Sequence, residues 1–118
     1  SPNDADKQTP AGTRRQLRDM AVFIEACRTS DVVPVLCTPL PTSGLNEGQE
    51  AYRRQVAAAV RAAGAAGTLV LDFDTMLTNY AVNTGGWAVA GDTTDGLHPN
   101  QQGHVKMAAY ASGVLAGI

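Results

Sequence analysis

The sequence predicts an α/β fold with three layers, α/β/α, in which helices pack on both faces of a central parallel sheet. Two short apolar runs, residues 32–37 (VVPVLC) and 68–71 (TLVL), are rich in Val and Leu, which is typical of strands buried on both faces. Longer segments with apolar residues at helical spacing lie before, between and after them. Strands that alternate with helices favour parallel β-α units joined by right-handed crossovers.

The first helix is expected to begin near residue 10 and to end within residues 28–31. Either Thr9 caps it with Pro10 at its first position, or Thr13 and Gln16 form a capping box. One face of this helix is apolar and should be buried, and it consists of Leu17, Met20, Ala21, Ile24 and Cys27.

The remaining elements follow from the same kind of pattern. Pro34 removes one ladder donor from the first strand, which favours a bulge or a less central strand. Residues 38–48 and 81–97 are expected to be loops, and Asp74 is expected to cap a short helix that runs through Tyr80. A second helix is expected over about 49–66, and its apolar face consists of Tyr52, Val56, Ala59, Val60 and Ala63. A last helix is expected from about residue 100 to the end, and its apolar face consists of Met107, Ala108, Ala111, Val114 and Leu115.

Composition limits the classes of function. The 118 residues suit one domain or a large piece of one, and 44% hydrophobic with 17% charged residues is typical of a globular chain. The net charge of −2 and the lack of a basic cluster interleaved with aromatics disfavour nucleic-acid binding, and no apolar run reaches membrane-spanning length. Cys27 and Cys37 lack metal-ligand spacing and are interpreted as buried free thiols, with a disulfide between them as the alternative.

The strongest chemical signal is the string at residues 95–100 (DGLHPN), just before the last helix. An Asp three residues before a His can bend back to the imidazole and fix its tautomer, which leaves the other ring nitrogen able to take a proton from a hydroxyl nucleophile. Pro99 favours an extended backbone at His98, and Asn100 can cap the helix that follows.

This string, extended by Gly103 and His104, resembles the C-terminal signature of the SGNH (GDSL-like) hydrolase family. The resemblance implies that His98 and Asp95 are two members of a Ser-His-Asp triad. Residues 1–4 (SPND) resemble the family's Gly-x-Asn-Asp block, with Ser1 where the family usually has Gly. By this resemblance, Asn3 is an oxyanion-hole donor.

The family's Gly-Asp-Ser block and its separate oxyanion-hole Gly are absent from the chain. The resemblance therefore implies that residues 1–118 are the C-terminal portion of a single SGNH domain, with the last two strands of a five-stranded flavodoxin-like sheet. An upstream segment or companion chain would supply the serine. The implied reaction is cofactor-free and metal-independent ester hydrolysis through an acyl-enzyme, on acetylated carbohydrates or on short-chain acyl esters or lipids. The family also favours a secreted or cell-envelope location.

Other polar residues have two interpretations each. Ser43 follows the first strand, where parallel sheets place ligand-contacting groups, or it is a simple loop hydroxyl. Trp87 lines the substrate pocket or anchors its loop, and His104 is expected to be a helix-surface or packing residue. Asp72 and Asp74 are interpreted as strand-end and helix-cap residues rather than as a metal site.

Two rival functions remain open from the sequence. One is a non-catalytic SGNH-like domain that binds carbohydrate or protein. The other is an N-terminal-nucleophile hydrolase that uses Ser1 and its own amine.

Overall fold

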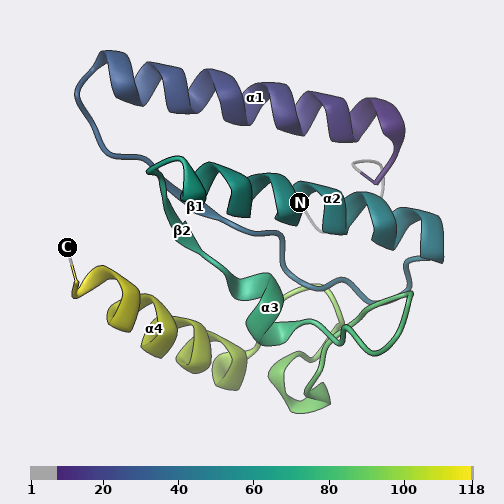
Figure 1. Cartoon of the computed structure of the whole chain (residues 1–118). Helices are drawn as coiled ribbons and strands as arrows, with labels where there is room; N and C mark the ends of the chain where they lie inside the picture. Colours follow the sequence, from purple (N-terminus) through teal and green to yellow (C-terminus); the bar gives the residue numbers. More distant parts are fainter. Residues whose placement is uncertain (1–7, 118) are drawn as a thin grey trace.

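The structure is a computed structural model that describes residues 8–117. Its elements, in chain order, are α1 (Pro10–Thr29), β1 (Val35–Cys37), α2 (Glu47–Ala65), β2 (Leu69–Leu71), α3 (Phe73–Leu77), the 3₁₀ helix η2 (Ala90–Asp92) and α4 (Gln101–Leu115) (Figure 1).

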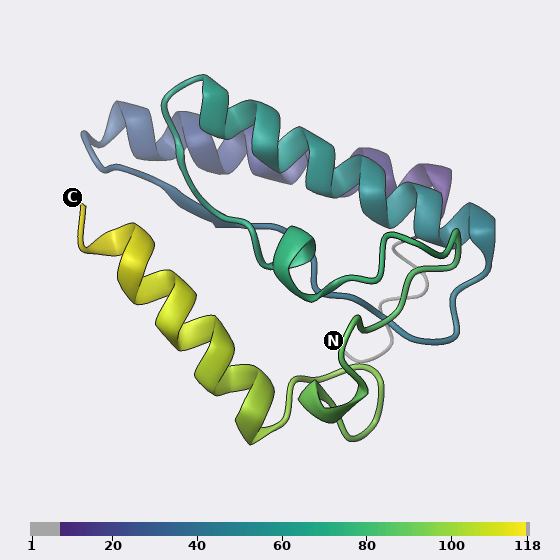
Figure 2. The ribbon, with the colours of Figure 1, turned by 60° about the horizontal axis from the view of Figure 1, so that its bottom comes forward.

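The two strands form a parallel sheet between layers of helices. Val35 lies opposite Leu69, and Cys37 lies opposite Leu71. Helices α1 and α2 cover one face of this sheet and α4 covers the other, as the two views in Figures 1 and 2 agree in showing. The expected three-layer α/β/α arrangement is therefore confirmed.

The first strand is shorter and more exposed than expected. It begins at Val35 rather than at residue 32, and Val32, Val33 and Val35 are exposed. Within residues 8–117, β1 pairs with β2 alone, so no neighbouring strand covers its other edge. The prediction that this run is buried on both faces is thus wrong for the described part of the chain.

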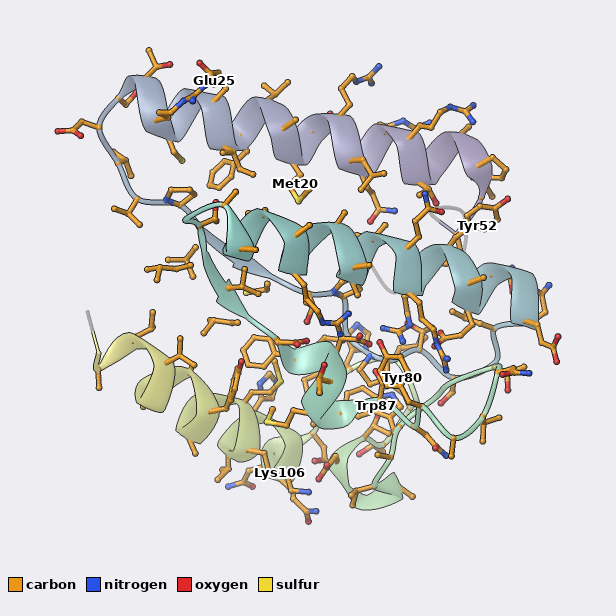
Figure 3. The ribbon with its side chains drawn as sticks, in the orientation of Figure 1. Met20, Glu25, Tyr52, Tyr80, Trp87 and Lys106 are labelled. Atoms are coloured by element: carbon orange, nitrogen blue, oxygen red, sulfur yellow. The ribbon has the colours of Figure 1, made fainter. Side chains whose placement is uncertain are left out.

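Helix α1 is capped by Thr9, which is the first of the two alternatives predicted for its start. The Thr9 side chain accepts a hydrogen bond from the Gly12 N–H at 3.0 Å, and Pro10 occupies the first turn. Met20 points from α1 towards α2 (Figure 3). The apolar face of α1 is only half-buried, however, and Ala21 on it is exposed. Neither cysteine is buried: Cys27 is partly exposed and Cys37 is exposed, both as free thiols, so the expectation of buried thiols is wrong.

Helix α2 begins at Glu47, two residues before the expected start, because Asn46 forms a capping box with Gln49. The Asn46 side chain accepts from the Gln49 N–H at 2.8 Å, and the Gln49 side chain accepts from the Asn46 N–H at 2.9 Å. Its apolar face packs inward through Val56, Ala57 and Val60.

The cap of α3 differs from the prediction. Asp72, not Asp74, caps this helix, because its carboxylate accepts from the Thr75 N–H at 3.1 Å. The helix ends at Leu77 and does not reach Tyr80. Asp74 lies in the first turn with its carboxylate buried, where arginines engage it, as described below.

Helix α4 starts as predicted but turns a slightly different face to the core. Ala108 and Leu115 are exposed, contrary to expectation. Tyr110, which was not predicted to face the core, packs edge-on against Phe73, with ring centroids 5.7 Å apart. The residues that pack on the core of Leu71, Phe73 and Leu77 include Leu40, Met76, Trp87, Met107, Tyr110, Ala111 and Val114. Over residues 8–117, no helix combines the length and the apolar character that crossing a membrane requires.

Candidate active site

His98 and Asp95 form a hydrogen-bonded pair in the loop that precedes α4. His98 Nδ1 lies 2.7 Å from Asp95 Oδ2, with side-chain exposures of 56% and 50%. The hydrogen bond from the His98 ring, with those from the backbone N–H groups of His98 and Leu97, holds the pKa of Asp95 well below its ordinary value. An ionised carboxylate can only accept, so a neutral His98 ring donates from Nδ1 and keeps Nε2 as an acceptor.

Hydrogen bonds within residues 93–98 hold the loop around this pair. Asp95 Oδ1 accepts from the N–H groups of Leu97 and His98, both at 2.8 Å. Thr93 Oγ1 donates to the His98 carbonyl at 2.7 Å and accepts from the Gly96 N–H at 2.9 Å. Thr93 was not predicted from the sequence, because a threonine in a polar loop has no feature that distinguishes it from other turn residues.

The carbonyl of Gly96 is where three segments of the chain meet. The Trp87 indole N–H donates to this oxygen at 2.8 Å, and the Ser43 backbone N–H donates to it at 2.9 Å. Gly96 has a φ of 79°, and a Cβ there would lie 2.8 Å from the Ser43 side chain, so the position requires glycine. The structure thus places Ser43 and Trp87 beside the His-Asp loop, while their contact with substrate stays a prediction.

The residues after the His-Asp pair attach its loop to α4. Asn100 caps α4 by accepting from the Gly103 N–H at 3.0 Å, and its amide donates to the Gly91 carbonyl at 2.8 Å. A Cβ at Gly103 would lie 2.5 Å from the Asp92 carbonyl oxygen, so η2 can approach α4 this closely only beside a glycine. His104 is exposed, in agreement with the surface interpretation.

A second group of charges, which we call the ionic cluster, consists of Glu50, Arg53 and Asp74. Arg53 donates to both Glu50 oxygens at 2.7 Å and to Asp74 at 2.6 Å. The Arg53 side chain is 1% exposed, and the two carboxylates are fully buried. No role was predicted for Glu50 or Arg53 from the sequence, because charged residues on a helix are usually solvated.

The carboxylates of Asp72 and Asp74 face arginine as well. Arg61 donates to Asp72 at 2.9 Å and also to Asp74. Burial opposes ionisation of Asp72, but the hydrogen bonds from Arg61 and Thr75 outweigh it and lower its pKa. Guanidinium groups therefore take the places that a cation would need, and in residues 8–117 no three His, Cys, Asp or Glu side chains are grouped to hold a metal ion.

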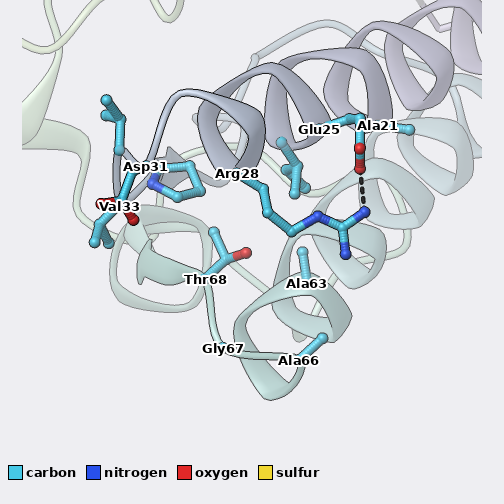
Figure 4. A pocket seen from close by; sticks show the side chains of 12 residues that line it. Ala21, Glu25, Arg28, Asp31, Val33, Ala63, Ala66, Gly67 and Thr68 are labelled. Carbon is cyan, nitrogen blue, oxygen red and sulfur yellow. Dashed lines mark hydrogen bonds and ion pairs between the residues drawn. The ribbon is translucent and has the colours of Figure 1, made fainter.

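The pocket shown in Figure 4 lies away from this site. It has a volume of about 560 Å³ and lies between the C-terminal ends of α1 and α2, beside the ion pair of Glu25 and Arg28. Val33 and Thr68, which precede the two strands, also line it. Because His98 belongs to the loops that follow the strands, this pocket is at the opposite end of the sheet.

Asn3, the predicted oxyanion-hole donor, lies outside the described residues, as does Ser1. Its role stays a prediction from the sequence.

The fold and the loop geometry define an α/β protein with a His-Asp pair at the carboxyl edge of a parallel sheet. Residues 2–106 match the model of the GDSL-like Lipase/Acylhydrolase family, and the chain belongs to that family. A search of curated proteins gives no match.

Two solved structures share the fold. A GDSL-like lipase from Bacteroides thetaiotaomicron VPI-5482 matches with a TM-score of 0.73 and 16% identity, over 98% of this chain and 59% of that one. A putative lipolytic protein of the G-D-S-L family from Desulfitobacterium hafniense DCB-2 matches with a TM-score of 0.65 and 26% identity, over 94% of this chain and 59% of that one. The chain thus spans 59% of the length of each.

Proposed function

We propose that residues 1–118 are the C-terminal portion of a single GDSL-like ester-hydrolase domain and supply its general base. The observation that carries this proposal is the 2.7 Å contact between His98 Nδ1 and Asp95 Oδ2 in a half-exposed loop. The pair leaves Nε2 of the ring as an acceptor on the side away from the carboxylate. Family membership over residues 2–106 supports hydrolysis of carboxylic esters.

In the proposed reaction, a serine hydroxyl attacks the ester carbonyl while His98 Nε2 takes its proton. Asp95 stays ionised and stabilises the imidazolium that forms. Asn3 would donate to the oxygen that gains negative charge. The imidazolium then gives its proton to the leaving alcohol, and a water molecule, deprotonated by the same ring, releases the acid from the acyl-enzyme.

We propose that the serine comes from an upstream segment or a companion chain. Two observations support this: the chain spans 59% of the length of each matching structure, and β1 pairs along one edge only within the described residues. Val35 and Cys37 on that strand are exposed, as is expected if a further strand from the upstream segment pairs with its other edge.

For the substrate, we propose acetylated carbohydrates or short-chain acyl esters and lipids. The family's description as lipases and acylhydrolases supports acyl esters in general.

Substitution of the two histidines tests the proposal in the intact protein, with p-nitrophenyl acetate as substrate. His98→Ala should lower kcat by about 10⁴ with little change in the melting temperature. His104→Ala is the matched control, because His104 is exposed further along the chain on α4, and it should have little effect. A His98 variant with normal kcat, or a more damaging His104 variant, would contradict the assignment.

A further inference from the structure

We propose that Trp87 is a positioning residue, whose indole N–H orients the loop that carries Asp95 and His98. This inference rests on the proposed function, in which His98 is the general base. It adds that a residue outside the His-Asp loop sets the geometry of the pair by acting on the backbone of Gly96.

The peptide unit between Gly96 and Leu97 is held at both ends. Its carbonyl accepts from Trp87 Nε1 at 2.8 Å and from the Ser43 N–H at 2.9 Å. Its N–H, which belongs to Leu97, donates to Asp95 Oδ1 at 2.8 Å. Because a peptide unit is planar, fixing the direction of the carbonyl also fixes the direction of the N–H.

The orientation of that N–H determines where the Asp95 carboxylate lies. The same Oδ1 accepts a hydrogen bond from the His98 N–H at 2.8 Å, while Oδ2 is hydrogen-bonded to Nδ1 of the His98 ring at 2.7 Å. A rotation of the Gly96–Leu97 peptide would therefore move the carboxylate and, with it, the imidazole. Since the two side chains are half-exposed, we expect these hydrogen bonds to constrain their positions more than packing does.

Trp87 itself is firmly held. Its ring packs against the core of Leu71, Phe73 and Leu77, and its backbone forms an antiparallel bridge with Thr78. The next residue, Ala88, donates to the Leu77 carbonyl at 2.9 Å. The indole thus packs on the core on one side and donates its hydrogen bond to the more exposed His-Asp loop on the other.

Helix α2 supports the segment that leads to Trp87. Arg54 donates to the Val82 carbonyl at 2.7 Å, and its guanidinium lies 4.4 Å from the centroid of the Tyr80 ring. Arg54 also donates to Glu50 of the ionic cluster at 2.7 Å. Figure 3 shows Tyr80 and Trp87 below α2, on the side of α3.

The test is Trp87→Phe in the intact protein, which keeps an aromatic ring against the core but removes the N–H. We expect kcat on p-nitrophenyl acetate to fall about 10-fold or more with KM nearly unchanged, because small displacements of catalytic groups are costly. The proton NMR signal of His98 Nδ1–H, identified by its loss in His98→Ala, should broaden or shift. A substrate-contacting role would instead raise KM and leave this signal in place, and that result would overturn the proposal.

Tyr110→Phe is the matched control. The Tyr110 oxygen accepts from the Asp72 N–H at 2.9 Å and its ring packs on the same core, so its hydrogen bond goes to the end of β2 rather than to the His-Asp loop. This variant should lower the melting temperature and leave kcat and the Nδ1 signal unchanged. If Trp87→Phe merely repeats this pattern, Trp87 is a packing residue and the proposal fails.

Two further cases have to be distinguished, a variant that does not fold and a wild-type protein without esterase activity. If Trp87→Phe does not fold, replacing the indole by its benzothiophene analogue keeps the shape and removes only the N–H, and the same outcomes apply. If the wild-type protein hydrolyses no ester, the proposed function fails, but the Nδ1 signal still supports or overturns the positioning role.

Discussion

The ionic cluster and the His-Asp loop both pair carboxylates with cationic or ionisable side chains, but they differ greatly in burial. In the ionic cluster, Arg53 is 1% exposed and its two carboxylate partners are fully buried. In the His-Asp loop, His98 and Asp95 are 56% and 50% exposed. The carboxylates of both regions nevertheless have pKa values below the ordinary range.

The causes of these lowered pKa values differ. Burial opposes ionisation of Glu50, and hydrogen bonds from Arg53 and Arg54 outweigh it. At Asp95, the hydrogen bonds from the His98 ring and the loop backbone lower the pKa with little opposing burial. In the cluster, Arg53 on α2 pairs with Asp74 on α3, so we expect the cluster to lock the two helices together, whereas a neutral His98 ring keeps one acceptor nitrogen in a half-exposed loop. Reactivity is expected where a partner retains an unused proton acceptor, not where charges are most concentrated.

The largest expected effect is on the loop pair. Asp95→Asn replaces an acceptor-only group by one that can also donate, so the ring loses its preferred tautomer. In the intact protein, kcat should fall by about 10⁴ while the melting temperature changes little. Steady-state kinetics with a parallel thermal melt measure both, and an Asp95→Asn variant with wild-type kcat would remove Asp95 from the site.

The corresponding change in the ionic cluster should affect stability instead. Arg53→Met removes the buried partner that Glu50 and Asp74 share and leaves them the partly exposed Arg54 and Arg61 as cationic partners, at a cost of up to about 3–5 kcal/mol in the free energy of unfolding. Arg28→Met is the matched control, because Arg28 also pairs with a glutamate three residues before it but is 77% exposed. That control should cost less than about 1 kcal/mol.

Denaturant unfolding of the intact protein measures both arginine variants. If Arg53→Met is no more destabilising than Arg28→Met, the ionic cluster does not lock α2 to α3.

A smaller effect is expected from pH. The pKa of Glu50 is lower in the folded protein than in the unfolded chain, so its contribution to stability is complete above the unfolded value of about 4.3 and is lost as the pH falls through the folded value. Glu50→Gln removes this contribution. The difference in melting temperature between wild type and Glu50→Gln should be constant from pH 7 to about 5 and should shrink below about pH 4. A difference that grows on acidification would contradict the assigned direction.

The same two regions explain which features were predictable from sequence. Asp95 and His98 are three residues apart in a loop, so their contact is local and follows from spacing and turn geometry. The order of helices and strands likewise followed from apolar periodicity. Arg53 and Asp74, in contrast, are brought together only by the packing of α2 against the end of β2, and no local pattern marks that contact.

Other differences have the same origin. The sequence left Trp87 with two interpretations, because the Gly96 carbonyl that it contacts is defined by the closed shape of another loop. The exposure of Val32 and Val33 depends on which strands lie beside β1, which a single run of apolar residues cannot specify. Asp72 rather than Asp74 caps α3, and the buried carboxylate of Asp74 pairs instead with Arg53 and Arg61, which are distant in sequence.

The central claim is that this chain supplies the base and its orienting carboxylate to a serine that lies outside it. Labelling of the intact protein with a serine-directed fluorophosphonate, followed by mass spectrometric mapping of the modified residue, tests this claim most directly. We predict a single labelled serine in the segment or chain that accompanies residues 1–118, with labelling abolished by His98→Ala and retained in His104→Ala. A label on Ser1, Ser30, Ser43 or Ser112, or no label at all, would contradict the claim, and the last of these results would favour a non-catalytic binding domain.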